Sequence, residues 1–122
     1  MTTGAWVSAA GYGWPWMACA ASTRNAIAVV DTSLAAGRAF SRAAGRRAMP
    51  VFETGDDIGA LWYATLAPRL AASQDLLIGL TRSSDYFVLG ELARRSGRMI
   101  VRSEPCAGAH ASVVFLMGPG AT

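Results

Sequence analysis

Histidine and cysteine are scarce in this 122-residue sequence. It contains a single histidine, His110, and two cysteines, Cys19 and Cys106. These are too few for a closed structural zinc site, which needs four ligands. Cys106 and His110 have helix-like spacing, but they fall where a turn is predicted and no third residue is placed to orient them. We therefore expect no metal site and no cysteine–histidine catalytic pair.

The signatures of nucleotide-binding enzymes are also missing. No Gly-x-Gly-x-x-Gly follows the first predicted strand and no Gly-x-x-x-x-Gly-Lys-Ser/Thr occurs anywhere, which argues against a dinucleotide enzyme and a P-loop ATPase. No Gly-x-Ser-x-Gly elbow precedes a helix. A response-regulator receiver domain would place a phosphate-accepting aspartate where this chain has Leu80-Thr81. We expect no cofactor.

Lysine is absent, so all eleven basic residues are arginines. With abundant alanine and glycine, this pattern indicates a coding bias more than a chemical choice. The formal charge is +3 and the pI is near 9.4, but the arginines are dispersed and repeatedly neighbour Asp or Glu, as on a solvated surface. Arg38, Arg42 and Arg46 recur every four residues, and we interpret this stripe as a solvent face. We expect no nucleic-acid partner, whose binding would weaken steeply with salt.

Charge is absent from the first part of the chain, because Gly4 to Ser22 carries no ionisable side chain except Cys19 and Tyr12. Residues 1–22 are therefore either signal-peptide-like, with a small-x-small motif at Ala18 to Ala20, or an apolar N-terminal arm. A signal predicts a periplasmic or otherwise exported protein with no stable membrane span in the mature chain, and an arm predicts a cytoplasmic one. Cleavage after Ala20 would remove Cys19. If the segment is retained, Cys19 could instead form a disulfide bond with Cys106.

Apolar runs and helical periodicity alternate along residues 23–122, which predicts a single α/β domain. Strands are expected at 26–30, 48–52, 75–81, 98–104 and 111–118. Helices are expected at 34–47, 57–73 and 83–97. The last connection is too short for a crossover helix, so the final strand must form a hairpin and run antiparallel. The predicted fold is a three-layer β-α-β-α-β-α-β-β arrangement around a mainly parallel twisted sheet, Rossmann- or flavodoxin-like.

The predicted helices carry signals for their ends and for their buried faces. Thr54 precedes the second helix with Asp57 three residues on, which predicts a capping box, and Pro68 should end or kink that helix near Ala67. In the third helix we expect Val88, Leu89, Leu92 and Ala93 to face inward, and Gly97 to stop the helix. Trp62 lies on an apolar helix face and is expected in the core.

Polar residues gather after the predicted strands, at the carboxyl edge where ligands of such sheets bind. Arg82 and the helix start at Ser84 would stabilise a phosphate, sulfate or carboxylate there. The candidate ligand-binding residues are Asp31, Thr32, Ser33, Thr54, Asp56, Thr81, Arg82, Ser83 and Ser84, with Asp57, Ser103 and Glu104 as possible neighbours. The same residue types cap helices, so structural capping is the competing interpretation.

Two functions follow from these patterns. The first is an exported accessory or binding protein that holds a small anionic ligand at this edge or meets a protein partner. The second is a small metal-assisted hydrolase or phosphoryl-transfer enzyme that uses Asp31 and the Thr81–Ser84 turn. Asp31 with Asp56 or Asp57 suits magnesium only weakly, because no phosphorylatable Asp-x-Asp pair follows the first strand.

The segments "DTSLAAGRAF", "ALWYATLAPRL", "LIGLTRSSDYFVLGELARRSGRMIVRSE" and the closing "GP" resemble a group of small, functionally uncharacterised proteobacterial proteins described mainly by an N-terminal twin-arginine export signal. The similarity spans most of Asp31 to Pro119. It implies export to the periplasm in a folded state, although no twin arginine precedes the apolar segment in this sequence. It names no reaction.

Overall fold

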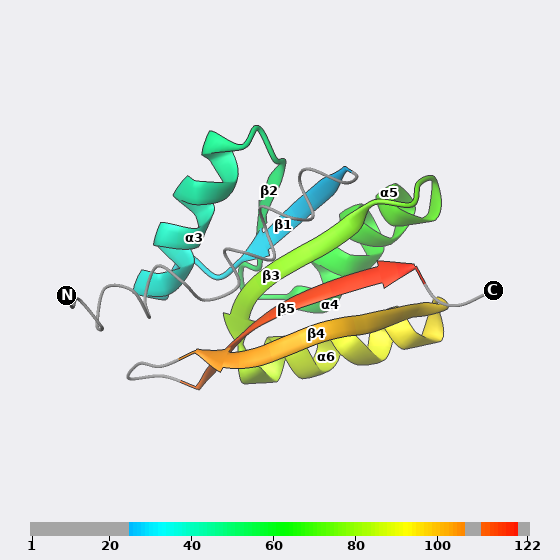
Figure 1. Cartoon of the computed structure of the whole chain (residues 1–122). Coiled ribbons are helices and arrows are strands. Elements are labelled where there is room, and N and C mark those ends of the chain that lie inside the picture. The colour runs from blue at the N-terminus through cyan, green and yellow to red at the C-terminus, as the bar shows by residue number, and fades with distance from the viewer. Residues whose placement is uncertain (1–24, 107–110, 120–122) are drawn as a thin grey trace.

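The computed structural model describes residues 25–106 and 111–119 (Figure 1). The predictions for the segment 1–22, for Cys19 and for His110 fall outside these residues. The strands are β1 (Ala26–Val30), β2 (Val51–Glu53), β3 (Leu76–Arg82), β4 (Arg98–Cys106) and β5 (Ser112–Pro119). The helices are α3 (Ala35–Arg46), α4 (Ile58–Leu61), the π-helical segment η1 (Trp62–Leu66), α5 (Ala67–Ala71) and α6 (Ser83–Arg95).

The five strands form one open sheet in the order β2-β1-β3-β5-β4. β1 pairs in parallel with β2 and with β3, while β5 pairs antiparallel with both β3 and β4. The α/β class and the antiparallel last strand are therefore confirmed. The sheet is mixed, with two parallel and two antiparallel pairings, so the mainly parallel, flavodoxin-like order is not confirmed.

Burial explains why β5 lies between β3 and β4. Its segment "SVVFLMGP" is apolar on both sides, and Val114, Phe115 and Met117 are fully buried. A strand of this kind needs a neighbour and a covered face on each side. β4 instead carries Arg98, Arg102 and Pro105, is mostly exposed, and has a register shift between Ile100 and Arg102. Charges, proline and bulges are the usual protection of an edge strand.

Helices cover both faces of the sheet (Figure 1). Phe40, Ala43 and Ala44 of α3 pack with Val30 and Ile78 on one face. The helical run from α4 to α5, together with α6, covers the other face. There Trp62, Leu66 and Leu89 pack with Val29 and Phe115. Trp62 is only 2% exposed, which confirms it as a core residue. Each core cluster is continuous with the sheet, which makes the strand ends a rigid base for the site.

The run from Ile58 to Ala71 differs from the prediction at two points. Pro68 does not end the helix, which passes through it into α5. The irregularity comes one turn earlier, as a π-helical segment in which the N–H of Ala67 reaches the carbonyl of Trp62. This wider turn accommodates a proline, which has no N–H and crowds the preceding turn. The N-cap is Asp57, whose carboxylate accepts from the Ala60 N–H at 3.0 Å, so the predicted capping box on Thr54 is wrong.

Other predictions for the helices are mostly confirmed. Arg38, Arg42 and Arg46 are all exposed, as expected of a solvent face. Gly97 follows α6 with a φ of 83°, a conformation that glycine adopts without strain. Val88 was predicted to face inward and is 36% exposed instead. No helix within the described residues is long and apolar enough to cross a membrane.

Candidate polar pocket at the carboxyl edge

The carboxyl ends of β1 and β3 lie side by side, because these strands pair directly. β2 lies on the other side of β1. The chain therefore adds β2 on one side of β1 and then β3 on the other, so the strand order reverses at β1. Asp31 follows β1 and its N–H donates to the Leu80 carbonyl of β3 at 3.0 Å. Arg82 is the last residue of β3. The topology thus places an acidic and a basic side chain next to each other where such sheets bind ligands.

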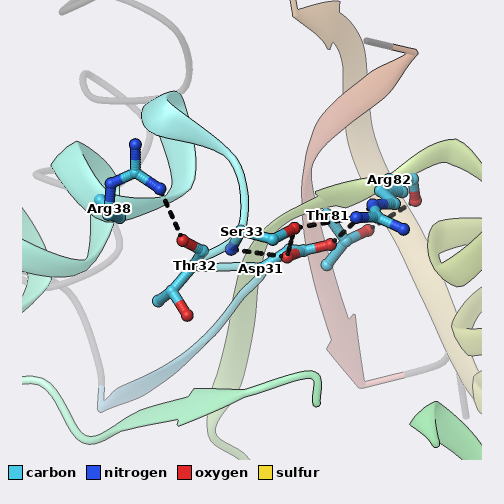
Figure 2. A network of polar contacts seen from close by, with 6 residues as sticks. All are labelled: Asp31, Thr32, Ser33, Arg38, Thr81 and Arg82. Atoms are coloured by element: carbon cyan, nitrogen blue, oxygen red, sulfur yellow. Dashed lines mark hydrogen bonds and ion pairs between the residues drawn. The ribbon is translucent and has the colours of Figure 1, made fainter. Parts of the chain in front are cut away.

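Asp31, Ser33 and Arg82 form a closed polar network (Figure 2). One carboxylate oxygen of Asp31 accepts from the N–H of Ser33 at 2.9 Å and from its hydroxyl at 2.5 Å. The other oxygen lies 3.3 Å from Nε of Arg82, and Nη2 of Arg82 donates to the Ser33 hydroxyl at 3.0 Å. Asp31 is buried, whereas 57% of the Arg82 side chain is exposed. The network therefore holds the guanidinium in place and leaves part of it open to a ligand.

A pocket of about 310 Å³ opens beside this network. This volume lies at the small end of the range of ligand pockets in proteins. The pocket is lined by Asp31, Thr32, Ser33, Glu53, Thr54, Gly55, Asp56, Arg82, Ser84 and Asp85. Every one of these residues except Gly55 has a polar side chain. The walls come from the ends of β1, β2 and β3 and from the first turn of α6, so three strands position them.

Seven of the nine predicted site residues line this pocket: Asp31, Thr32, Ser33, Thr54, Asp56, Arg82 and Ser84. Thr81 does not, because it is fully buried and its hydroxyl donates to the Arg82 carbonyl at 2.9 Å. Ser83 does not line it either, and its N–H donates to the Ala111 carbonyl at 3.1 Å. Ser103 and Glu104 lie on β4, which β5 separates from β3.

Three lining residues were not among the predicted ones: Glu53, Gly55 and Asp85. Glu53 is the last residue of β2, and it accepts from the Thr32 hydroxyl at 2.9 Å. Its position at a strand end was a usable signal. Asp85 is in the first turn of α6, next to the predicted Ser84. Acidic residues are common there for helix stability alone, so this position gave no separate hint of a pocket.

Helix capping accounts for little of this polar set. Leu34 and Arg82 are the N-caps of α3 and α6, and neither makes a side-chain cap. Among the residues that the structure describes, the side-chain cap at this edge comes from Asp57, which does not line the pocket. The competing interpretation, in which the predicted hydroxyls and carboxylates serve as N-caps, is therefore wrong for α3 and α6 and holds for α4, which Asp57 caps. Asp31 does have a local role, since it closes the turn at Ser33.

Thr54 is the least expected member of the pocket. It is only 4% exposed. Its N–H donates to the Val30 carbonyl at 2.9 Å, but its hydroxyl makes no hydrogen bond within residues 25–106 and 111–119. A buried hydroxyl without a partner is unfavourable and uncommon in folded proteins. Because Thr54 lines the pocket, a ligand is in a position to supply that partner.

Carboxylates outnumber the guanidinium in the lining, with Asp31, Glu53, Asp56 and Asp85 against Arg82. Burial raises the pKa of Asp85 above its ordinary value, repulsion from Asp31 raises it further, and Arg82 lowers it. The pKa direction shows that the negative charge on Asp85 is poorly compensated. The pocket therefore combines a single basic group at the β3 end with excess acidic groups around it.

Metal and thiol chemistry find little support in the described residues. No group of three or more His, Cys, Asp or Glu side chains is arranged to hold a metal ion in that part of the chain. Cys106 is buried and belongs to the core cluster on the sheet face that α3 covers. Its burial raises the pKa of the thiol, although a hydrogen bond with Ser112 lowers it. A neutral buried thiol is a weak nucleophile.

Comparison of the chain with protein-family models, with curated proteins and with solved structures finds no match. The geometry of the pocket is therefore the basis for inferring a function.

Proposed function

We propose that this protein is a binding protein for a small polar molecule, whose acidic group contacts Arg82 in the pocket at the carboxyl edge. The observation that carries the proposal is the network of Asp31, Ser33 and Arg82. It fixes a half-exposed guanidinium at the mouth of the pocket and uses only Nε and Nη2. The third nitrogen, Nη1, makes no hydrogen bond within the described residues. A carboxylate or phosphate is the natural acceptor for such a donor.

The first turn of α6 adds to this binding potential. Helix N-termini carry free N–H groups and a partial positive charge that favours anions. The N–H of Ser83 is already used by Ala111, which leaves the next N–H groups, at Ser84 and Asp85, facing the pocket end of the helix. Ser84 and Asp85 both line the pocket. An acidic ligand group at Arg82 would thus have the helix N-terminus beside it.

The test is a thermal-shift and calorimetric titration of the full chain with phosphate, sulfate and small carboxylates. We expect at least one of these anions to raise the melting temperature of the wild type and to lose about tenfold or more in affinity in Arg82→Ala, as removal of a charge-assisted hydrogen bond predicts. Arg42→Ala is the matched control, because it removes the same charge from an exposed residue outside the pocket. Equal binding by wild type and Arg82→Ala would overturn the proposal.

We also propose export of the protein, on the basis of the apolar N-terminal segment and the resemblance described above. Fractionation of cells that express the full chain tests this. Periplasmic protein that has lost its N-terminal segment is the expected result, and full-length protein confined to the cytoplasm would contradict it. The metal-assisted hydrolase has no supporting observation of comparable strength. Insensitivity of ligand binding to a chelator separates it from the binding protein.

A further inference from the structure

Charge is distributed unevenly across the pocket. Arg82 stands at the β3 end, while Glu53 and Asp56 stand at and just after the β2 end. β1 lies between these two strands. Neighbouring strands are about 4.8 Å apart, so the two ends are separated by roughly 10 Å at the backbone. The basic and the acidic ends of the pocket are therefore distinct places.

Within residues 25–106 and 111–119, no ion pair neutralises the carboxylates at the β2 end. Arg82 is paired with Asp31, and the remaining ion pairs of the described residues involve Arg94 with Glu91 and Arg102 with Glu104. Glu53 accepts a hydrogen bond from the neutral hydroxyl of Thr32. A purely anionic ligand that enters this pocket would meet repulsion from Glu53, Asp56 and Asp85. A cationic group placed near them would be attracted instead.

Thr54 supplies the second, independent observation. It lies between Glu53 and Asp56 in the sequence, lines the same wall, and is more than nine-tenths buried with a hydroxyl that has no hydrogen-bond partner in the described chain. A hydroxyl oxygen accepts hydrogen bonds, and an ammonium group is a donor with three N–H bonds. An ammonium group bound at this wall would satisfy Thr54 together with the two carboxylates.

We infer that the ligand is an amino carboxylate whose carboxylate binds Arg82 and whose ammonium group binds the wall formed by Glu53, Thr54 and Asp56. This inference rests on the proposed function, which supplies the Arg82 end. Because the two ends stand on strands that β1 separates, we take this ligand to be a zwitterion with several bonds between its charges, such as an ω-amino acid.

The experiment uses three probes of equal chain length on the full chain: ε-aminocaproate, caproate and hexylamine. The first has both charged groups, the second lacks the ammonium and the third lacks the carboxylate. We expect ε-aminocaproate to bind about tenfold or more tightly than either of the others, since each lost charge-assisted contact costs at least that factor. Glu53→Gln and Asp56→Asn should each weaken ε-aminocaproate and leave caproate unchanged or slightly tighter.

Asp57→Asn is the matched control for these substitutions. It removes an acidic charge from the same loop, but Asp57 caps α4 and does not line the pocket. Its affinity for ε-aminocaproate should stay within about twofold of the wild type, and its melting temperature should change little, because asparagine caps a helix about as well as aspartate does. A melting curve for each variant identifies any loss of binding that is caused by unfolding.

The outcomes separate this inference from the proposed function. If caproate and ε-aminocaproate bind equally well and both need Arg82, the inference is wrong and the proposed function stands. Hexylamine binding as tightly as ε-aminocaproate, with no effect of Arg82→Ala, would overturn both. Absence of binding by all three probes and by phosphate and sulfate would also overturn both.

Discussion

Arg98 and Arg82 lie at opposite ends of the sheet, Arg98 at the start of β4 and Arg82 at the end of β3. Arg98 donates to the backbone carbonyls of Leu70, Ser73 and Asp75 at 2.7, 3.2 and 3.1 Å. Its guanidinium thus ties the loop before β3 to the edge strand. Burial lowers the pKa of Arg98, and the charge of Asp75 raises it. Arg82 contacts only side chains, which form a wall of the pocket.

The partners of the two guanidinium groups distinguish a structural arginine from a binding arginine in this chain. A guanidinium surrounded by backbone carbonyls has its donors committed to holding loops together. One that contacts a carboxylate and a hydroxyl beside a pocket is positioned and still partly available. Both arginines look alike in the sequence, because each stands at a predicted strand boundary. Their partners, which come from distant segments, distinguish them.

The largest effect should come from the backbone beneath the pocket. A Cβ atom on Gly37 would lie 2.0 Å from the Asp31 carbonyl oxygen, so α3 must move away from the end of β1. We expect Gly37→Ala to lower the free energy of unfolding by about 3 kcal/mol, as severe overpacking does. Chemical denaturation measures this.

Gly45→Ala is its control in the same helix, since nothing lies within 4 Å of the added methyl group. This change should be neutral or raise the free energy of unfolding by about 0.5–1 kcal/mol, because glycine disfavours a helix. Similar losses in the two variants would show that the clash with Asp31 does not cause the loss in the free energy of unfolding.

Removal of each arginine tests the comparison directly. Arg98→Ala leaves three carbonyls without their charged donor, and we expect a loss of about 2–3 kcal/mol in the free energy of unfolding. Arg82→Ala should cost about 1 kcal/mol or less, because an ion pair with an exposed partner contributes little. Urea denaturation of both variants, with exposed Arg95→Ala as a charge control, gives these values.

Binding should show the reverse order. Arg98→Ala, where it is folded, should bind the anion or zwitterion probes with wild-type affinity, whereas Arg82→Ala should not. The distinction between a structural and a binding arginine fails if Arg82→Ala proves the less stable of the two, or if Arg98→Ala loses probe binding while folded.

The smallest effect concerns the charge of Asp85. Its pKa is raised in the folded protein by burial and by Asp31, against the opposing effect of Arg82. The folded state therefore holds the proton more tightly than the unfolded state does. Stability linked to Asp85 is present at low pH and is lost as the pH rises through the folded-state pKa. Asp85→Asn should accordingly raise the melting temperature slightly near neutral pH.

The gain from Asp85→Asn should disappear below the ordinary pKa of aspartate, where both residues are uncharged. Melting curves at several pH values measure the difference, and an NMR titration of the Asp85 carboxyl gives its pKa directly. A gain that is the same at every pH would mean that packing or helix propensity, and not charge, is responsible.

Most elements of this fold could be predicted from the sequence. β1 and β3 are continuous apolar runs, and the periodicity around Phe40 and Leu89 marks helices that bury one face. The order of the strands was harder. A hairpin requires β5 to lie next to β4, but it does not say on which side. The contrast between the apolar "SVVFLMG" and the arginines of β4 contained that answer, since a strand buried on both faces belongs inside the sheet.

The candidate site could likewise be predicted only in part from the sequence. Strand ends could be located from the sequence, which predicts that Asp31, Ser33 and Arg82 meet at one edge of the sheet. The role of Thr54 could not be predicted, because its spacing to Asp57 matches a capping box. In the structure Asp57 caps the helix by itself. Thr54 therefore keeps a buried hydroxyl that is available to a ligand.

The sequence by itself determined the α/β class, the positions of the strands and helices, and the edge at which polar residues collect. These depend on local periodicity and on turn chemistry, which act over a few neighbouring residues. Tertiary structure decided that β5 is central, that Arg82 pairs with Asp31, and that Glu53 and Asp85 complete an acidic pocket around a single arginine. These features join residues that are far apart in the chain, because side chains from separate strands become neighbours only when the sheet forms and buries both of its faces.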